Sequence, residues 1–462
     1  MVASKPHVYV FPFPVQSHIN PMLEFSKSLA SNDKLNVTFI MTNKTMTNSK
    51  SNNNNNNNTS NITIESISDG SEEVQEPQST DVEYVFKNLE AVVSINLTKF
   101  IEQKKETLNG SKTLILVYDS VFPWMLDMAH KLNMIGAAFF TQSCAVTAIY
   151  YQVKKGSLRF PYVDEDCLGL PEFLPALGVD DLPKIMDENH ALMGVLVHQF
   201  SNLDKAEFMI FNTFEKLENE IVKWMATQWP IKTIGPTNLL VKKDNNNPSH
   251  KNNHVINLFE SSDQEVYTKW LDSKVTNSVI YVSFGSLVTL AESQMEEIAM
   301  GLVMSQCNFL WVVRASEEHK LPPNFTKSLS SEKGIIVNWC SQTEILAHRS
   351  ISCFLTHGGW NSTMEGVSSG VPLIAMPNFV DQTTNSKFIE GVWGVGVRVR
   401  GGENGMVSRD ELCKVVKEVV DGDKGKEIRN NAKMWKEYAK EAVDGGTSAK
   451  NIEDIVSRFL SA

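Results

Sequence analysis

In this chain of 462 residues, several features that would each indicate a particular class of protein are rare or absent. Its six cysteines are scattered, with no CxxC pair and no spacing typical of metal ligands, which argues against a disulfide framework. No stretch approaches the ~20 consecutive apolar residues that a membrane span needs. The N-terminal residues lack the apolar run of a signal peptide. We therefore expect reduced thiols, a cytoplasmic location and no integral membrane contact.

The chain also has fewer basic than acidic residues. Lys and Arg number 43 against 54 Asp and Glu, which gives a net charge of −11 and argues against nucleic acid or an anionic membrane surface as a partner. The contents of 42% hydrophobic and 21% charged residues are those of an ordinary globular protein. Because the length exceeds what one hydrophobic core usually supports, we predict two domains, and we expect a monomer whose partners are small molecules.

Apolar runs of strand length alternate with helical patterns along the chain, which is typical of parallel sheets with crossover helices. The predicted strands are residues 8–13, 37–42, 62–67, 113–118, 278–284, 309–314, 334–339, 351–356 and 372–375. The polar stretch 242–255 has the composition of a linker and separates two sets of strands. We therefore predict an α/β fold of two doubly wound, Rossmann-like domains, residues 1–241 and 256–446, that face each other across a cleft.

Two polar residues of the first half follow predicted strands. His18 stands in the loop PFPVQSHINP, before a helix that we expect to begin at Asn20 and Pro21, and Asp119 comes directly after strand 113–118. Ligands of open parallel sheets bind beyond the carboxyl ends of the strands. A neutral histidine oriented by a carboxylate can act as a general base. Taken alone, however, a histidine in a loop is more often structural than catalytic.

The segment from residue 339 to 382 combines several features of a nucleotide-sugar site. An apolar strand leads into the turn Gly358–Gly359 and then into a helix, so free amide groups and the positive end of the helix dipole would face an anion such as a diphosphate. Trp339, upstream, could stack on a base. Asp381 and Gln382, downstream, offer the acceptors and donors that sugar hydroxyls need.

This segment resembles, in length and without a gap, the signature box of the plant family 1 glycosyltransferases, which use uridine-diphosphate sugars; the resemblance extends over the whole chain. It implies a GT-B type fold whose C-terminal helix, residues 447–462, packs back on the first domain. It also implies inverting, metal-independent transfer from UDP-glucose, with His18 as the catalytic base and Asp119 as its partner. Ser17 departs from the glycine that usually precedes this histidine, and a positive φ there would carry a steric cost.

The resemblance also assigns the donor site. The residues expected to contact uracil and ribose are Trp339, Cys340, Gln342 and Glu365. Those expected around the diphosphate are Ser286, His357, Gly359, Trp360, Asn361 and Ser362. Those expected to hold the sugar are Thr141, Asp381 and Gln382, and a glutamine in the last place favours glucose over galactose.

The acceptor is less well specified. Candidate residues of an apolar acceptor pocket are Phe13, Pro14, Phe122, Trp124, Cys144, Ile149, Met193, Phe379 and Val380. The stretches VYDSVFPW, FFTQSCAV and ISDGSEE resemble the subgroup that acts on small carboxylic acids, thiohydroximates, triterpenoids and steroids. Because no Arg or Lys stands in the candidate segments to pair an acid, we favour a steroid or triterpenoid hydroxyl. Glucose ester formation on a small carboxylic acid and glucosylation of a phenol stay open as alternatives.

Other interpretations have less support. A non-catalytic nucleotide-sugar binder would keep the segment 339–382 but would lack the His18 and Asp119 pair. A nicotinamide-dependent oxidoreductase would have a glycine-rich turn after the first strand, where PFPVQSH has no glycine. The acidic stretches 164–166 and 421–423 match a metal-binding D-x-D pattern, but we interpret both as solvated charge and expect no metal.

Overall fold

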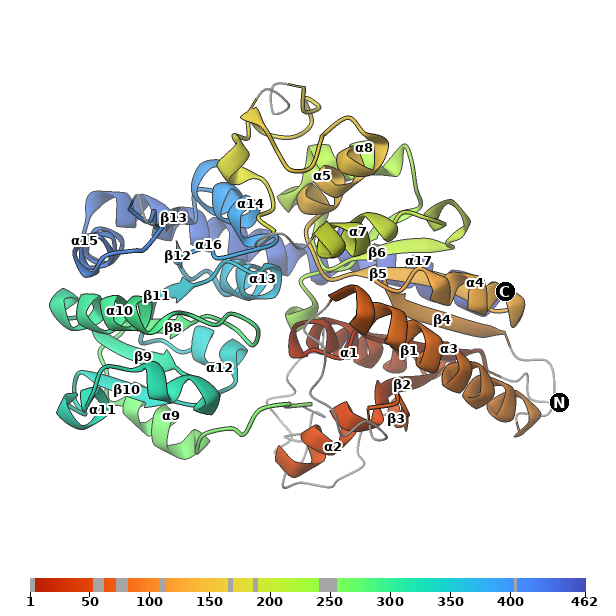
Figure 1. Cartoon of the computed structure of the whole chain (residues 1–462), viewed down its shortest axis with the longest axis horizontal. Helices are drawn as coiled ribbons and strands as arrows, with labels where there is room; N and C mark the ends of the chain where they lie inside the picture. Colours follow the sequence, from red (N-terminus) through yellow and green to blue (C-terminus); the bar gives the residue numbers. More distant parts are fainter. Residues whose placement is uncertain are drawn as a thin grey trace. The chain divides into compact units, whose positions relative to one another are not determined.

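The computed structural model describes residues 5–52, 62–71, 82–107, 113–164, 169–185, 190–240, 256–402 and 405–462, so the predicted linker 242–255 lies outside the described residues. The chain divides into two compact units (Figure 1). Unit 1 comprises Met1–Leu174, Ile185–Leu258 and Glu441–Ala462, and unit 2 comprises Pro175–Lys184 and Phe259–Lys440. This division differs from the predicted domains mainly at residues 175–184, which the structure places in unit 2, and at residues 441–446, which it places in unit 1.

Unit 1 is built on a parallel sheet. Its strands follow the order β3 (Ile62–Ile67), β2 (Asn36–Thr42), β1 (His7–Phe11), β4 (Leu114–Asp119), β5 (Ile135–Phe140), β6 (Phe208–Phe211) and β7 (Ile231–Thr233). The chain builds outward from β1 in one direction and from β4 in the other. The pair β1–β4 is therefore the topological switch point, and the pairing of Phe11 with Tyr118 brings the ends of these two strands together.

Unit 2 repeats this plan. Its parallel sheet has the order β10 (Gly334–Val337), β9 (Asn308–Val312), β8 (Val279–Ser283), β11 (Ile351–Thr356), β12 (Leu373–Ala375) and β13 (Gly396–Arg398). Its switch point lies between β8 and β11, where Ser283 pairs with Thr356. Each unit thus has one place, beyond the carboxyl ends of two adjacent strands, where a ligand is expected.

Helices connect the strands in both units (Figure 1). Those of unit 1 are α1 (Gln16–Ala30), α2 (Asn43–Asn52), α3 (Val82–Thr107), α4 (Trp124–Lys131), α5 (Cys144–Lys155), α7 (His190–His198), α8 (Asn219–Ala226) and α17 (Thr447–Ser461). Those of unit 2 are α9 (Gln264–Asp272), α10 (Glu292–Ser305), α11 (Phe325–Ser328), α12 (Gln342–Leu346), α13 (Trp360–Ser369), α14 (Gln382–Lys387) and α15 (Arg409–Val420), and α16 (Asp423–Val443) leads back to unit 1. None of the helices in the described ranges is long and apolar enough to cross a membrane.

Alternating side chains along the strands form the core of each unit, because successive residues of a strand point to opposite faces. In unit 1, Val8 and Val10 of β1 belong to a buried cluster that also contains Phe25 of α1 and Phe459 of α17, so these two helices cover one face of the sheet. The last helix is also joined to the sheet region by Ser448, whose hydroxyl donates to the carbonyl of Gly235.

The corresponding face in unit 2 is covered by α10 and α15. Val282 of β8 and Leu355 of β11 share a buried cluster with Ile298 of α10 and Val416 of α15. The sheet is buried on this face by helices that lie before β9 and after β13 in the chain. The result is a rigid platform beneath the loops that follow β8 and β11.

The start of α1 differs from the prediction. The helix begins at Gln16, four residues before the expected Asn20, so His18 lies in the first helical turn and not in a loop. Ser17 is also helical and is not among the residues with positive φ, so the steric cost considered for this position does not arise. Residue 18 therefore has a fixed backbone, and its side chain starts from a defined direction.

Phe459 offers a test of how α17 stabilises unit 1. Its side chain has no exposed surface and its ring lies 6.4 Å from that of Phe208 on β6. We expect Phe459→Ala to lower the free energy of unfolding by about 3–5 kcal/mol, because it removes a fully buried ring and leaves a cavity. Urea unfolding measures the change. The neighbouring Leu460→Ala, at a position 37% exposed, is the control, and an equal loss in both variants would contradict the packing described.

Candidate functional site

The switch point of unit 1 brings His18 and Asp119 together, 101 positions apart in the chain. Nδ1 of His18 lies 2.7 Å from Oδ2 of Asp119, whose carboxylate is completely buried at the end of β4. The backbone N–H of Phe13 donates to the same oxygen at 3.1 Å, and that of Val121 donates to Oδ1 at 3.3 Å. The carboxylate is thus held in place and fixes the imidazole through Nδ1, while the histidine side chain keeps 21% of its surface exposed.

Thr141 lies at the same pair. It follows β5, the neighbour of β4, and its hydroxyl is 3.0 Å from Nδ1 of His18. The start of α5 just beyond it is capped by Glu218, whose carboxylate accepts from the N–H of Cys144 at 3.2 Å and of Ala145 at 2.8 Å. Burial raises the pKa of Glu218. Glu218 could not be found from the sequence, because it comes from a different loop more than 70 positions away.

An aromatic cluster stands beside His18. The ring of Phe13 lies 5.4 Å from the imidazole and stacks on Phe86 of α3, with 5.3 Å between centroids and an angle of 7°. Phe122 is 5.6 Å from Phe13 and 5.8 Å from Trp124. Phe86 was missed in the sequence because a single aromatic residue in a helix carries no pattern.

The other predicted acceptor residues differ in exposure. Pro14 is partly exposed, whereas Cys144 and Ile149 have no exposed surface and pack in the core of unit 1. The structure therefore places these two residues under the surface and not on it. Met193, on α7, keeps 4% of its surface exposed. Phe379 and Val380 belong to unit 2, and both are partly exposed.

At the switch point of unit 2, His357 follows β11 and lies between two glycines. A Cβ added at Gly285 would come within 2.7 Å of its ring, and one added at Gly359 within 2.5 Å, so only glycine leaves room for the imidazole at both positions. Desolvation lowers the pKa of His357 to about 4, although a hydrogen bond that the imidazole donates to the backbone of Ser283 acts in the opposite direction. The ring is therefore neutral at pH 7 and brings no positive charge to the site.

Helix α13 begins beside His357, with Gly359 as its N-cap and Trp360 as its first residue. Oδ2 of Asp381 accepts from the N–H of Trp360 at 3.1 Å and from Nδ2 of Asn385 at 2.7 Å. A carboxylate at a helix N-terminus is favoured by the dipole. Asp381, predicted to hold the sugar, thus also fixes the start of the helix that is predicted to hold the diphosphate. Asn361 and Ser362 follow in its first turn.

Gln382 is held in its own loop. Its Oε1 accepts from the backbone N–H of Asn378 at 2.8 Å and of Phe379 at 3.1 Å. The side chain is 4% exposed. Because the oxygen is used by the loop, the amide nitrogen is the group that remains for a ligand.

Three predicted ribose and diphosphate residues form one cluster. Nε2 of Gln342 donates to Oγ of Ser362 at 3.0 Å and to Oε2 of Glu365 at 2.8 Å. The hydroxyl of Tyr281, on β8, donates to Oε1 of Gln342 at 3.3 Å. Tyr281 was missed because a tyrosine in an apolar strand is usually a buried core residue. Its role is to orient Gln342 from beneath.

Trp339 is partly exposed, and one of its faces is covered. Phe259 stacks on the indole with 4.3 Å between centroids and an angle of 25°, so a base could stack only on the opposite face. The adjacent Cys340 is buried, and burial raises the pKa of its thiol to about 12. This thiol stays protonated at neutral pH, and its sulfur lies 3.8 Å from the hydroxyl of Tyr281.

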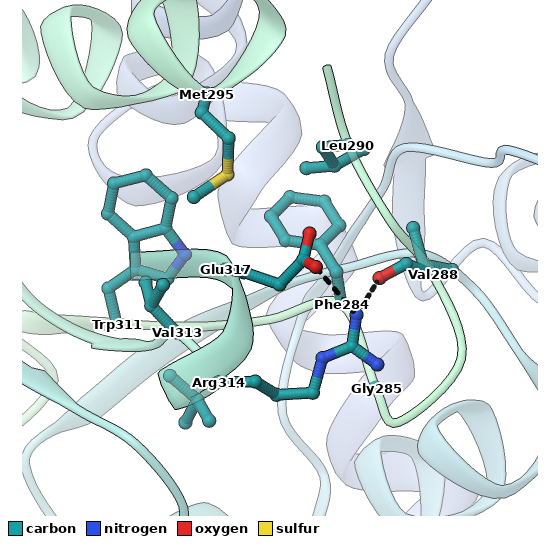
Figure 2. Close-up of a pocket in the computed structure, with 10 residues that line it drawn as sticks. Phe284, Gly285, Val288, Leu290, Met295, Trp311, Val313, Arg314 and Glu317 are labelled. Carbon is teal, nitrogen blue, oxygen red and sulfur yellow. Dashed lines mark hydrogen bonds and ion pairs between the residues drawn. The ribbon is translucent and has the colours of Figure 1, made fainter. Parts of the chain in front are cut away.

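The loop after β8, which carries Ser286, is fixed from below by Arg314 (Figure 2). The guanidinium donates to the carbonyl of Ser286 and, at 2.6 Å, to that of Val288, while Glu317 stands 3.9 Å away. The guanidinium borders a pocket whose other walls are mainly apolar, with Trp311 among them. Burial lowers the pKa of Arg314. The sequence did not reveal this residue, because its partners are backbone carbonyls.

A metal site was not expected. Within the described residues, no three His, Cys, Asp or Glu side chains are grouped so that they could hold a metal ion. Of the acidic stretch 164–166, residues 165 and 166 lie outside the described residues, and Asp423 is the first residue of α16. The absence of a metal stays a prediction.

Comparisons with known proteins identify the family of the chain. A family model described as glycosyltransferase, N-terminal domain, matches residues 5–233, and one described as UDP-glucoronosyl and UDP-glucosyl transferase matches residues 201–438. UDP glycosyltransferase 9 of Catharanthus roseus is 44% identical over 98% of this chain and 97% of its own length, and a mogroside I-E synthase of Siraitia grosvenorii is 42% identical over 97% and 96%.

A solved structure is similar throughout. Os79 of O. sativa in complex with UDP has a TM-score of 0.88 and 34% sequence identity, with 98% of this chain and 100% of that chain covered. A second structure of Os79 contains U2F and trichothecene and has a TM-score of 0.86. The chain belongs to the plant family 1 UDP-glycosyltransferases, enzymes of GT-B fold whose donor is a UDP-sugar. The predicted family, fold class and enzyme class are thereby confirmed.

His357 predicts a pH dependence of stability. Its folded pKa of about 4 lies below its ordinary value, so the unfolded chain binds more protons between these two values, and stability that is present above pH 6.5 is lost as the pH falls toward 4. We expect His357→Gln, which cannot titrate, to be free of this loss. Between pH 7 and pH 4.5, the free energy of unfolding of the wild type should therefore fall more than that of the variant.

Urea unfolding at the two pH values measures this difference. His130→Gln, at an exposed position on α4, is the control for a histidine without such an environment. Parallel pH dependence in the wild type and in His357→Gln would contradict the neutral, desolvated state of His357.

Proposed function

We propose that the protein is an inverting, UDP-glucose-dependent glucosyltransferase that acts on a hydroxyl of a hydrophobic plant small molecule, of steroid or triterpenoid type. The observation that carries this proposal is the pair formed by His18 and the buried Asp119, 2.7 Å apart, beside an aromatic wall. A protein that only bound nucleotide sugars would have no need of a histidine held in one orientation by a buried carboxylate.

His18 acts as the general base. Nδ1–H of the imidazole donates to Asp119, which leaves Nε2 to accept the proton of the acceptor hydroxyl. As the proton moves to Nε2, the acceptor oxygen forms a bond to the anomeric carbon of glucose, and the bond between that carbon and the diphosphate oxygen breaks. Asp119 stabilises the imidazolium that results, so no free proton or alkoxide has to form. Attack opposite the leaving UDP inverts the anomeric configuration.

The groups of unit 2 hold the donor and receive the negative charge of the departing UDP. The first turn of α13, with Asn361 and Ser362, offers amide groups and the positive end of the helix dipole. His357 lies beside this turn as a neutral ring, and Ser286 adds a hydroxyl from a loop fixed by Arg314. In this proposal the charge is accommodated without a metal.

The nucleoside and sugar parts follow from the remaining residues. Uracil stacks on the face of Trp339 opposite Phe259, and the ribose hydroxyls meet the cluster of Gln342 and Glu365. Asp381 and the amide of Gln382 hold glucose. Thr141, whose hydroxyl lies 3.0 Å from Nδ1 of His18, is a further proposed contact of the sugar.

The acceptor side favours a neutral, bulky molecule. Phe13, Phe86, Phe122 and Trp124 form a continuous aromatic group next to His18, and this surface suits a rigid apolar skeleton better than a small acid. The related Os79, crystallised with trichothecene, supports an acceptor that is a small organic molecule.

Replacement of His18 tests the assignment of the base. We expect His18→Ala to lower kcat by about 100- to 10,000-fold, because general-base assistance is lost, while the Kd for UDP is unchanged. Steady-state kinetics with calorimetric titration of UDP measures both quantities. The control is His130→Ala, at an exposed position on α4, which should keep wild-type rates. A His18→Ala enzyme with near-normal kcat would show that the base lies elsewhere.

A panel of acceptors tests the substrate class. We expect UDP-glucose to be consumed faster with hydroxylated steroids or triterpenoids than with flavonoids or aromatic acids. The products should resist mild alkali, because an O-glucoside is an acetal and not an ester. Phe86→Ala should raise the KM for the acceptor about tenfold through loss of buried aromatic area. Tyr84→Ala, on the same helix and 58% exposed, is its control. Alkali-labile glucose esters as the main products would contradict the proposed acceptor class.

A further inference from the structure

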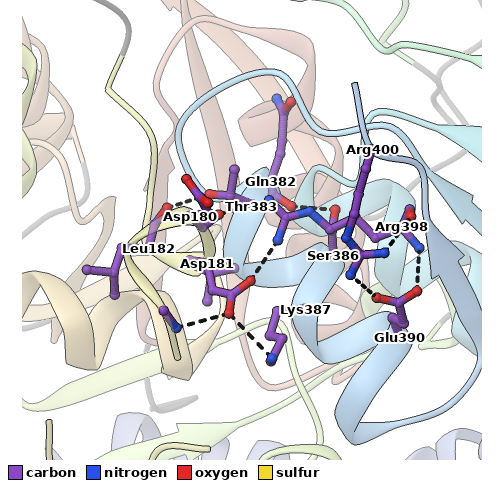
Figure 3. A network of polar contacts seen from close by, with 12 residues as sticks. Asp180, Asp181, Leu182, Gln382, Thr383, Ser386, Lys387, Glu390, Arg398 and Arg400 are labelled. Atoms are coloured by element: carbon purple, nitrogen blue, oxygen red, sulfur yellow. Dashed lines mark hydrogen bonds and ion pairs between the residues drawn. The ribbon is translucent and has the colours of Figure 1, made fainter. Parts of the chain in front are cut away.

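Ten residues from the first half of the chain are built into the donor-binding unit. The crossing segment, Pro175–Lys184, belongs to unit 2, although the chain on either side of it belongs to unit 1. It contains a single 3-10 turn, Val179–Asp181. The nearest features of unit 2 are the loop before α14, the helix α14 itself and the strand β13 (Figure 3).

The hydrogen bonds of the crossing segment lie on both sides of the proposed sugar-binding residues Asp381 and Gln382. Before them, Lys184 and Val380 exchange two backbone hydrogen bonds, of 2.9 and 2.5 Å, in an antiparallel bridge. After them, the hydroxyl of Thr383 donates to the carbonyl of Leu182 at 2.6 Å, and that of Thr384 donates to the carbonyl of Asp181 at 2.7 Å. The two sugar-binding positions are thus fixed by their neighbours on each side.

The backbone of Val380, in the loop before α14, has a conformation that must be stabilised by its surroundings. Its φ is +55°, in the left-handed region that a β-branched residue adopts only when its surroundings impose it. Both of its backbone polar groups are bonded to Lys184. Because Asp381 follows directly, the backbone direction at Val380 decides where the carboxylate of Asp381 points.

Asp181 fixes the crossing segment to the rest of unit 2. Its Oδ1 accepts from Nη1 of Arg398 at 2.7 Å, its Oδ2 lies 3.4 Å from Nζ of Lys387, and the carboxylate is only 15% exposed (Figure 3). The second terminal nitrogen of Arg398 donates to the carbonyl of Asp180 at 2.8 Å. One side chain therefore joins the crossing segment to the end of β13 and to the last residue of α14.

From this geometry we infer that the crossing segment, fixed by Asp181, positions Asp381 and Gln382 for recognition of the donor sugar. The inference rests on the proposed function, because it takes these two residues to bind glucose. Asp181 itself is a positioning residue and touches no substrate. Its influence reaches the sugar through the crossing segment, in which Lys184 and Leu182 bond to Val380 and Thr383, the residues next to Asp381 and Gln382. The uracil and ribose residues stand on other elements, such as α12 and α13.

The test is Asp181→Asn, which keeps the size of the side chain and removes its charge. We expect kcat/KM for UDP-glucose to fall about tenfold and the preference for UDP-glucose over UDP-galactose to narrow, because the sugar-binding residues lose their fixed direction. The Kd for UDP, measured by calorimetric titration, should change far less than kcat/KM, because the proposed uracil and ribose residues stand on other elements. The matched control is Asp180→Asn, because Asp180 is exposed and contributes its backbone carbonyl to Arg398.

Further variants separate positioning from folding. Asp181→Glu, which keeps the charge, should recover part of the lost sugar preference, and Asp181→Asn should add nothing to the effect of Arg398→Gln when the two are combined. If Asp181→Asn does not fold, Thr383→Val removes one hydrogen bond to the crossing segment and should reduce the sugar preference in the same direction.

Two results would overturn the inference. The first is an unchanged sugar preference in Asp181→Asn, or in Thr383→Val if that variant has to replace it. The second is a loss of affinity for UDP that equals the loss of kcat/KM for UDP-glucose. Failure of the proposed function would look different, because the wild-type protein would then bind no UDP or would transfer no glucose to any acceptor.

Discussion

The placement of strands at the two switch points is the constraint on which the rest of the structure depends. In unit 1, β1 lies beside β4, and the chain after β1 enters α1 within five residues, so the imidazole of His18 meets the last residue of β4. In unit 2, β8 lies beside β11, which places the loop of Gly285 and Ser286 against His357. Parallel strands end at the same edge of a sheet, so one topological rule brings both sets of chemical groups together.

Each site is stiffened by groups that never meet a substrate in the proposed reaction. Asp119 receives two backbone N–H groups besides His18, Glu218 caps α5 beyond Thr141, and Arg314 holds the carbonyls of the loop of Ser286. Such supports reduce the freedom of the reacting groups before the substrate arrives, which is how orientation contributes to rate. In unit 2, we infer that the crossing segment supports the loop of Asp381 and Gln382 in the same way, although it comes from the first half of the sequence.

Much of this arrangement could be predicted from the sequence. The strands 62–67 and 351–356 were predicted with their observed bounds. The resemblance of the segment 339–382 to the family's signature box assigned Gln342, Ser362 and Glu365 to one donor site, and the structure joins them by hydrogen bonds. What could not be predicted depends on contacts across the chain. Glu218, Phe86 and Arg314 carry no local pattern, and the membership of residues 175–184 in unit 2 rests on hydrogen bonds to residues some 200 positions later. The start of α1 was misplaced because Asn20 and Pro21 look like a helix start, whereas the helix begins at Gln16 with no side-chain cap.

In the proposed reaction, His18 is the base that directs an acceptor oxygen to the sugar from the side opposite the departing UDP. The anomeric configuration of the product reports this directly. Transfer from UDP-glucose, in which the sugar is α-linked, to an accepted hydroxyl should give a β-glucoside, identified by the proton NMR coupling of the anomeric hydrogen. An α-glucoside would contradict the account, because retention of configuration requires either a covalent sugar intermediate or attack from the same side as the leaving group.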